Sequence, residues 1–180
     1  MGERLPTRGK CEVLLLEPQE YFGTKKVIWS AMTKPAKKLT TGTEIDFGTG
    51  LTGRIVEEKS EGVRLIEFNT EEDFRESLDK IGTMPLPPYI LAKRGEKVSR
   101  DTDRERYQTI FAQSEGSVAA PTAALHFTDE LKQKLQAKGV EIIEITLHVG
   151  AGTFKPITAE NINEHPMHEE FFEISDESAE

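Results

Sequence analysis

The chain has 180 residues and a net charge of -9 at pH 7, with 36% hydrophobic and 31% charged residues. This balance is typical of a folded, water-soluble protein, and it argues against a general nucleic-acid binder because phosphate contacts need a surplus of Lys and Arg. No apolar run approaches the roughly 18 residues that a membrane-spanning helix needs, so we expect no membrane association and a cytoplasmic location.

The first 68 residues predict a small all-β domain. Five short β-rich runs follow one another, with glycines in the turns between them, over residues 10–17, 25–32, 43–47, 51–59 and 62–68. Short strands with hairpin connections favour a small barrel or a sandwich. Cys11 lies in the first run and is the only cysteine, which excludes an internal disulfide and a zinc cluster.

Charge is distributed unevenly along the chain. Residues 1–68 hold 11 basic and 10 acidic side chains, whereas residues 69–180 hold 12 basic and 22 acidic side chains. We therefore expect any RNA contact in the first portion, where Lys34, Lys37 and Lys38 lie close together. A solvated lysine loop is the alternative interpretation of that cluster.

Residues 69–180 predict an α/β region. Thr70–Ile81 has the capping residue and the apolar spacing of a helix, the three prolines within Met84–Tyr89 favour an extended segment, and the highly charged run Lys93–Arg106 predicts a loop. A second helix is expected to begin at Thr128 and to stop at Gly139. The β-branched run Val140–Val149 predicts a buried strand.

Two histidines lie where ligands commonly bind. His148 is near the carboxyl end of the predicted strand and is followed by Gly150 and Gly152, which would let a ligand approach the backbone closely. His126 and Thr128 lie at the start of a helix, whose free amides attract anions. The alternatives are a core histidine bonded to a carbonyl group and a threonine that only caps its helix.

Other candidates carry weaker signals. Arg104 and Arg106 could grip a phosphate or carboxylate group, and Tyr107 could stack on a base, although a charged loop needs no such role. His165 and His168 supply only two neutral metal ligands, so we expect no metal site. The P-loop, the dinucleotide-binding glycine fingerprint, the nucleophile elbow and the zincin helix motif do not occur in the sequence.

Five segments form an ordered set of motifs: Met84–Ile90, Arg104–Thr109, Val118–Thr128, Thr146–Pro156 and His165–His168. With these motifs in this order, the chain resembles the S-adenosylmethionine:tRNA ribosyltransferase-isomerase family of queuosine biosynthesis from about Arg4 to Ser175. Two departures concern glycines that are frequent in the family, which Ala124 and Ala36 replace here. The first narrows the expected pocket, and the second stiffens a turn of the first domain.

The resemblance implies a small closed β-barrel domain, residues 1–68, inserted in a larger α/β domain of which residues 69–180 would form an incomplete part. The amino- and carboxyl-terminal segments of the family are expected to be missing, which would leave strand edges and apolar surface exposed. The implied enzyme is monomeric and moves the ribosyl part of S-adenosylmethionine onto 7-aminomethyl-7-deazaguanine at the tRNA wobble position. S-adenosylmethionine is then a co-substrate, and no true cofactor is expected.

The same resemblance implies roles for individual residues. His148 or His126 would be the general base, and the other histidine or Glu170 would assist the departure of adenine. The glycine turn and Thr128 would bind the methionyl carboxylate. The residues expected to bind substrate are Arg104, Arg106, Tyr107, Ser117, Thr122, Thr128, Gly150, Gly152, Thr153 and His168.

Two further hypotheses belong to other classes of protein. One is a non-catalytic RNA-binding module that uses the turn around Lys34 to Lys38 of the first domain as its contact surface. The other is an α/β domain whose glycines and histidines are only structural. The catalytic hypothesis requires that the glycine turn after His148 and the small-residue segment before His126 line a common cavity.

Overall fold

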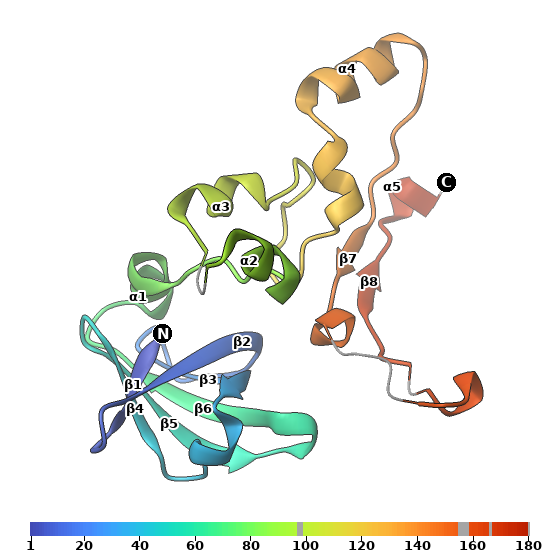
Figure 1. The fold of residues 1–180 in the computed structure, drawn as a ribbon. Coiled ribbons are helices and arrows are strands. Elements are labelled where there is room, and N and C mark those ends of the chain that lie inside the picture. Colours follow the sequence, from blue (N-terminus) through green and yellow to red (C-terminus); the bar gives the residue numbers. More distant parts are fainter. Residues whose placement is uncertain (97–98, 155–158, 166, 180) are drawn as a thin grey trace. The chain divides into compact units, whose positions relative to one another are not determined.

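A computed structural model gives the fold of the chain and describes residues 1–96, 99–154, 159–165 and 167–179. The chain divides into two compact units, Met1–Gly82 and Thr83–Glu180 (Figure 1). The first contains a closed β-barrel, and the second combines short helices with a two-stranded sheet. The predicted fold class is thereby confirmed. In the described part of the chain, no helix is long and apolar enough to cross a membrane.

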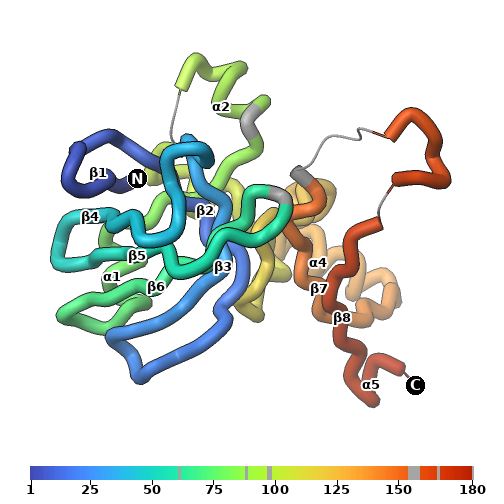
Figure 2. Tube along the Cα trace, turned by 90° about the horizontal axis from the view of Figure 1, so that it is seen from below, coloured from blue at the N-terminus to red at the C-terminus, as the bar shows by residue number. Residues whose placement is uncertain are grey.

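Six antiparallel strands form the barrel, in the order β1-β2-β3-β6-β5-β4 around the ring (Figures 1 and 2). Their bounds are Gly2–Leu5 for β1, Gly9–Tyr21 for β2, Lys26–Lys34 for β3, Glu44–Gly48 for β4, Leu51–Glu58 for β5 and Val63–Asn69 for β6. The strands β2 to β6 confirm the five predicted runs. β1 was not predicted, and it closes the ring by pairing with both β2 and β4.

Alternating side chains explain how β5 and β6 fit into the ring. Leu51, Gly53 and Ile55 of β5 are buried, while the residues between them are exposed. β6 alternates in the same way, with Arg64 at one of its buried positions. The Arg64 side chain remains satisfied there because its Nε donates to the carbonyl oxygen of Leu39 at 2.9 Å.

The helix α1 (Phe74–Ile81) packs with the barrel. Phe74 is buried, and its ring centroid lies 5.3 Å from that of Phe68 and 6.0 Å from that of Trp29. The barrel unit therefore extends to Gly82, beyond the boundary after residue 68 that the sequence suggested, because the first helix contributes an aromatic ring to the barrel core.

The start of α1 differs from the expectation. The helix is capped by Asp73, whose carboxylate accepts hydrogen bonds from the amides of Arg75 at 2.8 Å and Glu76 at 3.4 Å. Thr70 was expected in this role, but its hydroxyl instead lies 2.8 Å from the hydroxyl of Ser77. Both residue types are good caps, so the local sequence alone did not distinguish them.

The second unit contains short elements. They are the helices α2 (Pro88–Arg94), α3 (Asp101–Arg106), α4 (Asp129–Ala137) and α5 (Asp176–Ala179), the 3₁₀ turns η3 (Thr122–His126), η4 (Ala151–Phe154) and η5 (Ile162–Glu164), and the strands β7 (Thr146–His148) and β8 (Phe171–Glu173). Two more 3₁₀ turns, η1 (Ala36–Lys38) and η2 (Ser60–Gly62), lie in the barrel unit. Helix α4 confirms the predicted second helix, with Thr128 as its cap.

The expected extended segment at 84–89 and the expected loop at 93–106 are wrong in part. Helix α2 begins at Pro88, which is consistent with the preference of proline for the first turn of a helix. It continues to Arg94, and α3 occupies the end of the charged run. Prolines end a helix when they lie inside it, but they can also begin one.

The guanidinium of Arg94 links α2 to α3. Its Nη1 donates to the two carboxylate oxygens of Asp103 at 2.9 and 2.8 Å, and the amide of Arg100 donates to the same carboxylate at 2.8 Å. The Arg100 amide and the Arg94 guanidinium hold the pKa of Asp103 below its ordinary value. Arg94, Arg100 and Asp103 belong to the charged run 93–106, and they therefore form hydrogen bonds with one another within the fold.

The expectation of a buried strand over Val140–Val149 is wrong. Only Thr146–His148 forms a strand, and it pairs antiparallel with β8. Ile145 and Leu147 are 58% and 48% exposed. A fully buried strand requires packing on both faces of its sheet, and the described residues supply a single partner strand.

We expect Ile66→Ala to lower the free energy of unfolding of the barrel by about 2–5 kcal/mol, because it leaves a cavity in a fully buried core. Trp29 is the only tryptophan and packs against this core, so its fluorescence during urea unfolding measures the loss. Val56→Ala is the control, since Val56 is 37% exposed, and it should cost less than about 1 kcal/mol. Equal losses would contradict the packing described.

Candidate functional site

His148 stands at the end of β7, next to the glycine turn. Its ring centroid lies 5.5 Å from that of Phe171, its partner across the β7–β8 sheet. The Nδ1 atom of His148 is buried and has no hydrogen-bond partner among the described residues. A buried nitrogen without a partner is costly, which makes this imidazole a candidate for contact with a ligand.

Gly116 gives His148 the room it occupies. A Cβ atom at Gly116 would lie 2.3 Å from His148 Nδ1, which is closer than two non-bonded atoms can approach. Gly116 also has a φ of +146°, a conformation that L side chains rarely adopt. Both the contact and the backbone conformation therefore require glycine at this position.

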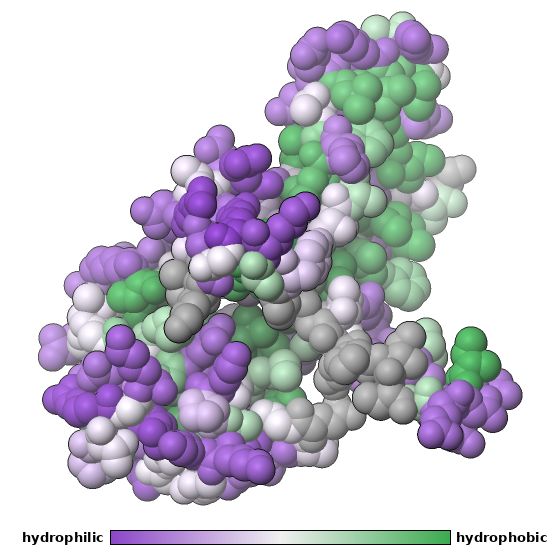
Figure 3. Space-filling model, in the orientation of Figure 1, coloured by the Kyte–Doolittle hydropathy of each residue, from purple (hydrophilic) through white to green (hydrophobic). Residues whose placement is uncertain are grey.

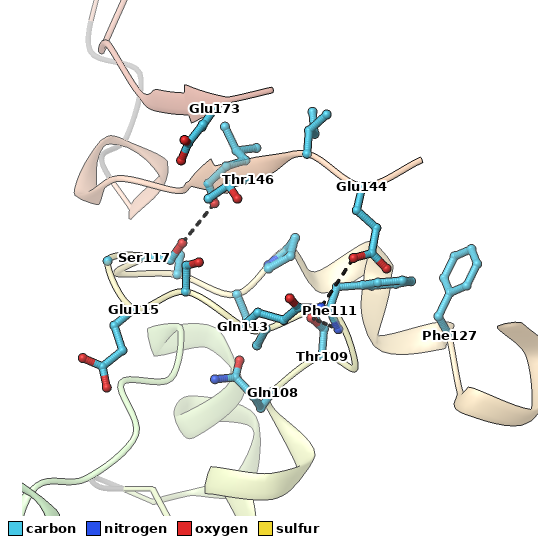
Figure 4. A pocket seen from close by; sticks show the side chains of 18 of the residues that line it. Gln108, Thr109, Phe111, Gln113, Glu115, Ser117, Phe127, Glu144, Thr146 and Glu173 are labelled. Carbon is cyan, nitrogen blue, oxygen red and sulfur yellow. Dashed lines mark hydrogen bonds between the residues drawn. The ribbon is translucent and has the colours of Figure 1, made fainter. Parts of the chain in front are cut away.

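Ser117 ties the segment after Gly116 to β7. Its Oγ donates to the carbonyl oxygen of Leu147 at 3.3 Å (Figure 4) and accepts from the amide of Val149 at 3.1 Å. The amide of Val118 donates to the carbonyl oxygen of Val149 at 2.9 Å. The Ser117 hydroxyl, expected to bind substrate, is thus engaged with backbone and holds in place the strand that carries His148.

The turn after β7 gathers two more of the predicted residues. The amide of Gly150 donates to Glu170 Oε1 at 2.9 Å, and a Cβ atom at Gly152 would lie 2.5 Å from His168 Cδ2. His148, Glu170 and His168 therefore surround one turn, which we call the glycine corner, Val149–Gly152. Histidine and glutamate side chains that meet at one turn are candidates for proton transfer.

Thr153, which was also expected to bind substrate, directly follows the glycine corner. It is exposed in η4, and its amide donates to the carbonyl oxygen of Gly150 at 3.4 Å. The described residues contain no group of three or more His, Cys, Asp or Glu side chains that could hold a metal ion.

Other predicted residues lie outside this corner. His126 and Thr122 are exposed at the two ends of η3. Among the described residues, no hydrogen bond or ring contact joins them to the glycine corner. The hydroxyl of Thr128 accepts from the amide of Leu131 at 3.2 Å. Thr128 therefore has the capping role that was the alternative to anion binding.

The charged segment before Gly116 contains both exposed and buried candidates. Arg104 and Arg106 are exposed on α3. Tyr107 is only 6% exposed, and its hydroxyl is buried without a partner among the described residues. Burial raises the pKa of this phenol above its ordinary value. The expected stacking of Tyr107 on a base would require its ring to become accessible.

A hollow of about 1090 Å³ lies beside the corner, between residues 107–121 and 140–147. Tyr107 and Ser117 are the predicted site residues that line it, whereas His148 and His126 do not. The small-residue segment and the strand before the corner line this hollow, whereas the glycine turn and both imidazoles do not, so it is not the common cavity that was expected.

The polar lining of this hollow was missed by the sequence analysis. It comes from Gln108, Thr109, Gln113, Glu115, Glu144, Thr146 and Glu173, among others (Figure 4). The Glu144 carboxylate accepts from Lys132 Nζ at 2.6 Å and from Gln113 Nε2 at 3.4 Å, and the Lys132 bond lowers the pKa of Glu144 below its ordinary value. Gln108, Thr109 and Thr146 lie in two of the family motifs, but no motif marks the other residues, which meet only in three dimensions.

The sequence matches the protein family described as queuosine biosynthesis protein over residues 1–180. It is 47% identical over 180 residues to the S-adenosylmethionine:tRNA ribosyltransferase-isomerase of Clostridioides difficile (strain 630), covering 99% of this chain and 49% of that protein. The protein of the same name from Desulfitobacterium hafniense (strain DSM 10664 / DCB-2) is 47% identical over 181 residues, covering 100% of this chain and 50% of that protein. The chain thus spans about half the length of the curated relatives it matches.

A solved structure is also similar. It is the S-adenosylmethionine tRNA ribosyltransferase from Thermotoga maritima, which has 21% sequence identity and a TM-score of 0.34. The match covers 99% of this chain and 40% of that chain.

We expect Gly116→Ala to displace the His148 ring, because the added methyl group would overlap Nδ1. The measurement is the NMR signal of the His148 Cε1–H group. Gly139→Ala is the control, since Gly139 also has a positive φ, of +80°, but a Cβ atom there meets nothing within 4 Å. Both variants carry the cost of an unfavourable φ, and only the first should shift the His148 signal. An unchanged signal in Gly116→Ala would contradict the contact.

Proposed function

The chain belongs to the family described as queuosine biosynthesis protein, and from this membership we propose that it serves the S-adenosylmethionine:tRNA ribosyltransferase-isomerase reaction. In that reaction the ribosyl part of S-adenosylmethionine is joined to the aminomethyl group of 7-aminomethyl-7-deazaguanine in tRNA. The product is epoxyqueuosine, and adenine and methionine are released. S-adenosylmethionine is consumed, so it acts as a co-substrate, and we propose no further cofactor.

The chemistry requires proton transfers. The positive sulfur of S-adenosylmethionine acidifies the ribose 5′ carbon, so a base can form an ylide there. Rearrangement of this ylide opens the ring, expels adenine and leads to the epoxide. A base near neutrality is therefore needed at the 5′ carbon, and a proton donor is needed for the departing adenine.

We assign His148 as the base, and its position at the glycine corner is the observation that carries the proposal. Gly116 packs against Nδ1, so Nε2 is the nitrogen that would take the proton from the substrate. Glu170 and His168 lie at the same corner. His126, the other candidate, is exposed on η3, and no hydrogen bond or ring contact among the described residues joins it to the corner. This difference favours His148 as the base.

Glu170 is the candidate that assists the departure of adenine. Its Oε1 accepts from the Gly150 amide at 2.9 Å, and the methionyl carboxylate of the substrate would compete for this same amide. Displacement by the substrate would free the Glu170 carboxylate to pass to the departing adenine the proton that His148 removes from the 5′ carbon. Thr128 is a weaker candidate for the carboxylate, because its hydroxyl already caps α4.

The tRNA contact is proposed at the barrel. Residues 1–68 carry one more basic than acidic side chain, whereas residues 69–180 carry ten more acidic than basic ones. Lys34, Lys37 and Lys38 are exposed around η1, and exposed lysines suit phosphate groups. Arg104 and Arg106 on α3 are further candidates. We propose that the reaction takes place in the cytoplasm, where tRNA is modified, and that the complete enzyme is monomeric.

The assay uses a family protein in which this chain replaces the matched half of the Clostridioides difficile relative. We expect release of adenine that depends on both S-adenosylmethionine and tRNA carrying 7-aminomethyl-7-deazaguanine. His148→Ala should slow this release by about 10² or more, the usual effect of losing a general base. His126→Ala is the matched control and should change the rate only slightly.

Two results would contradict the proposal. Near-normal turnover in His148→Ala would remove His148 from the role of base. Binding of tRNA with a steep dependence on salt, together with no release of adenine by the unsubstituted protein, would instead favour an RNA-binding module that uses the barrel.

A further inference from the structure

The hairpin that joins β2 to β3 exposes two consecutive aromatic side chains. Tyr21, the last residue of β2, is 54% exposed, and Phe22, the first residue of the turn, is 53% exposed. Among the described residues of the barrel unit, the other exposed large hydrophobic side chains are Met1 and Val56, and neither is aromatic. Hydrophilic side chains cover most of this unit on the face seen in Figure 3. The two exposed rings are therefore candidates for contact with another molecule.

Hydrogen bonds fix the backbone that carries these rings. The Phe22 amide donates to the carbonyl oxygen of Lys26 at 2.8 Å, which closes the turn. The amide of Phe74, the first residue of α1, donates to the carbonyl oxygen of Thr24 at 2.8 Å. Phe74 is itself buried in the barrel core, so the turn is tied to the most rigid part of the unit. Rings on a fixed backbone lose little conformational freedom when they bind a partner.

Two lysines accompany the rings, but the hairpin carries no net charge. Lys26 Nζ lies 5.6 Å from the centroid of the Phe22 ring and 3.0 Å from Glu67 Oε2. Lys25 is exposed in the same turn, and an exposed lysine can pair with a phosphate group. Residues 17–26 contain two acidic and two basic side chains. Attraction of phosphate groups alone is therefore weak here, and the rings must supply most of any contact.

We propose that residues 21–26, the aromatic hairpin, bind unpaired bases of the tRNA substrate. Tyr21 and Phe22 are the stacking surfaces, and Lys25 contacts a phosphate group beside them. Every base has a flat π-face, so stacking on an aromatic ring needs no particular base sequence. The wobble base belongs to the unpaired anticodon loop, so a tRNA substrate offers such bases. The choice of tRNA as the partner rests on the proposed function, to which the hairpin adds a second contact surface on the barrel.

This surface is separate from the lysines around η1. Lys26 begins β3 and Lys34 ends it, so the aromatic hairpin and the lysine cluster lie at opposite ends of one strand. A strand of this length spans roughly 25 Å. An RNA that reaches both surfaces must therefore extend along the barrel, and the effects of variants at the two surfaces on binding should add.

A protein partner fits the hairpin less well than RNA. Between the rings and β3 the turn consists of Gly23, Thr24 and Lys25, so no aliphatic side chain extends the aromatic surface. Stable protein interfaces bury a continuous apolar centre of much larger area. Stacking on a base requires only the exposed ring itself.

Filter binding with the 180-residue chain measures the contact. The probes are an RNA stem-loop with the anticodon sequence and a fully paired RNA duplex of equal length. We expect Tyr21→Ala and Phe22→Ala each to weaken stem-loop binding at least about fivefold and to leave duplex binding unchanged. Val56→Ala, elsewhere on the barrel, is the control and should change neither affinity.

Two further comparisons separate stacking from other contacts. Phe22→Tyr keeps an aromatic ring and should keep the affinity, whereas Phe22→Leu keeps an apolar side chain without a ring and should behave like Phe22→Ala. Loss of one phosphate contact in Lys25→Ala should reduce the slope of log affinity against log salt by about 0.7. Phe22→Ala should leave that slope unchanged, because the ring displaces no counterions.

Unchanged stem-loop binding in both ring variants would overturn the proposal, as would equal losses with the duplex or with Phe22→Tyr. Failure of the unsubstituted chain to bind the stem-loop would overturn it too. Phe22→Ala is also introduced into the chimera with the Clostridioides difficile relative. A lower unfolding temperature there, with unchanged affinity for the stem-loop, would identify a protein contact instead. Trp29 fluorescence during unfolding verifies that each variant is folded.

Release of adenine by the unsubstituted chimera tests the proposed function separately. Release of adenine together with unchanged RNA binding in the ring variants would overturn only the role of the hairpin. Weakened stem-loop binding in those variants without any release of adenine would support the hairpin contact and overturn only the proposed reaction.

Discussion

The attachment of residues 116–118 to β7 is the constraint on which the candidate site depends. Ser117 bridges the backbone of Leu147 and Val149, and these partners are 30 and 32 residues away in sequence. Besides this bridge, the Val118 amide donates to the carbonyl oxygen of Val149, and β7 shares three pairs of residues with β8. The bridge fixes the strand, the strand carries His148, and the glycine beside Ser117 leaves the space for the imidazole. Catalytic geometry of this kind requires backbone that does not move.

The two units reach stability in different ways. The barrel closes on itself, so each strand has two neighbours, and the side chains that alternate inward from β5 and β6 form a core together with Phe74. The second unit has short elements, few buried apolar side chains and a sheet of two strands. A closed ring needs nothing from outside, whereas an open sheet does. The proposed catalytic residues therefore lie in the unit that has fewer buried apolar side chains among the described residues.

The sequence predicted those features that local patterns encode. The strands β2 to β6 follow from alternation and glycine turns, and α4 follows from Thr128 with acidic residues behind it. β1 is only four residues long and became a strand by closing the ring, which no local pattern shows. Val140–Val149 has the composition of a buried strand, but composition cannot supply the neighbours that would bury it. The prediction failed there because it depended on packing.

The candidate site also has one part that local sequence patterns indicate and another part that depends on three-dimensional contacts. His148 and the glycine corner were predictable because a histidine before a glycine turn is a local feature, and Glu170 and His168 came from the family resemblance. The positions of Gly116 and Ser117 were not predictable in the same way, since the need for glycine at 116 arises from an imidazole 32 residues later. Ser117 was expected to contact substrate, yet its hydroxyl serves the backbone. A small polar residue near a candidate site can therefore act through the strand it positions, and only the three-dimensional contact distinguishes that role from substrate binding.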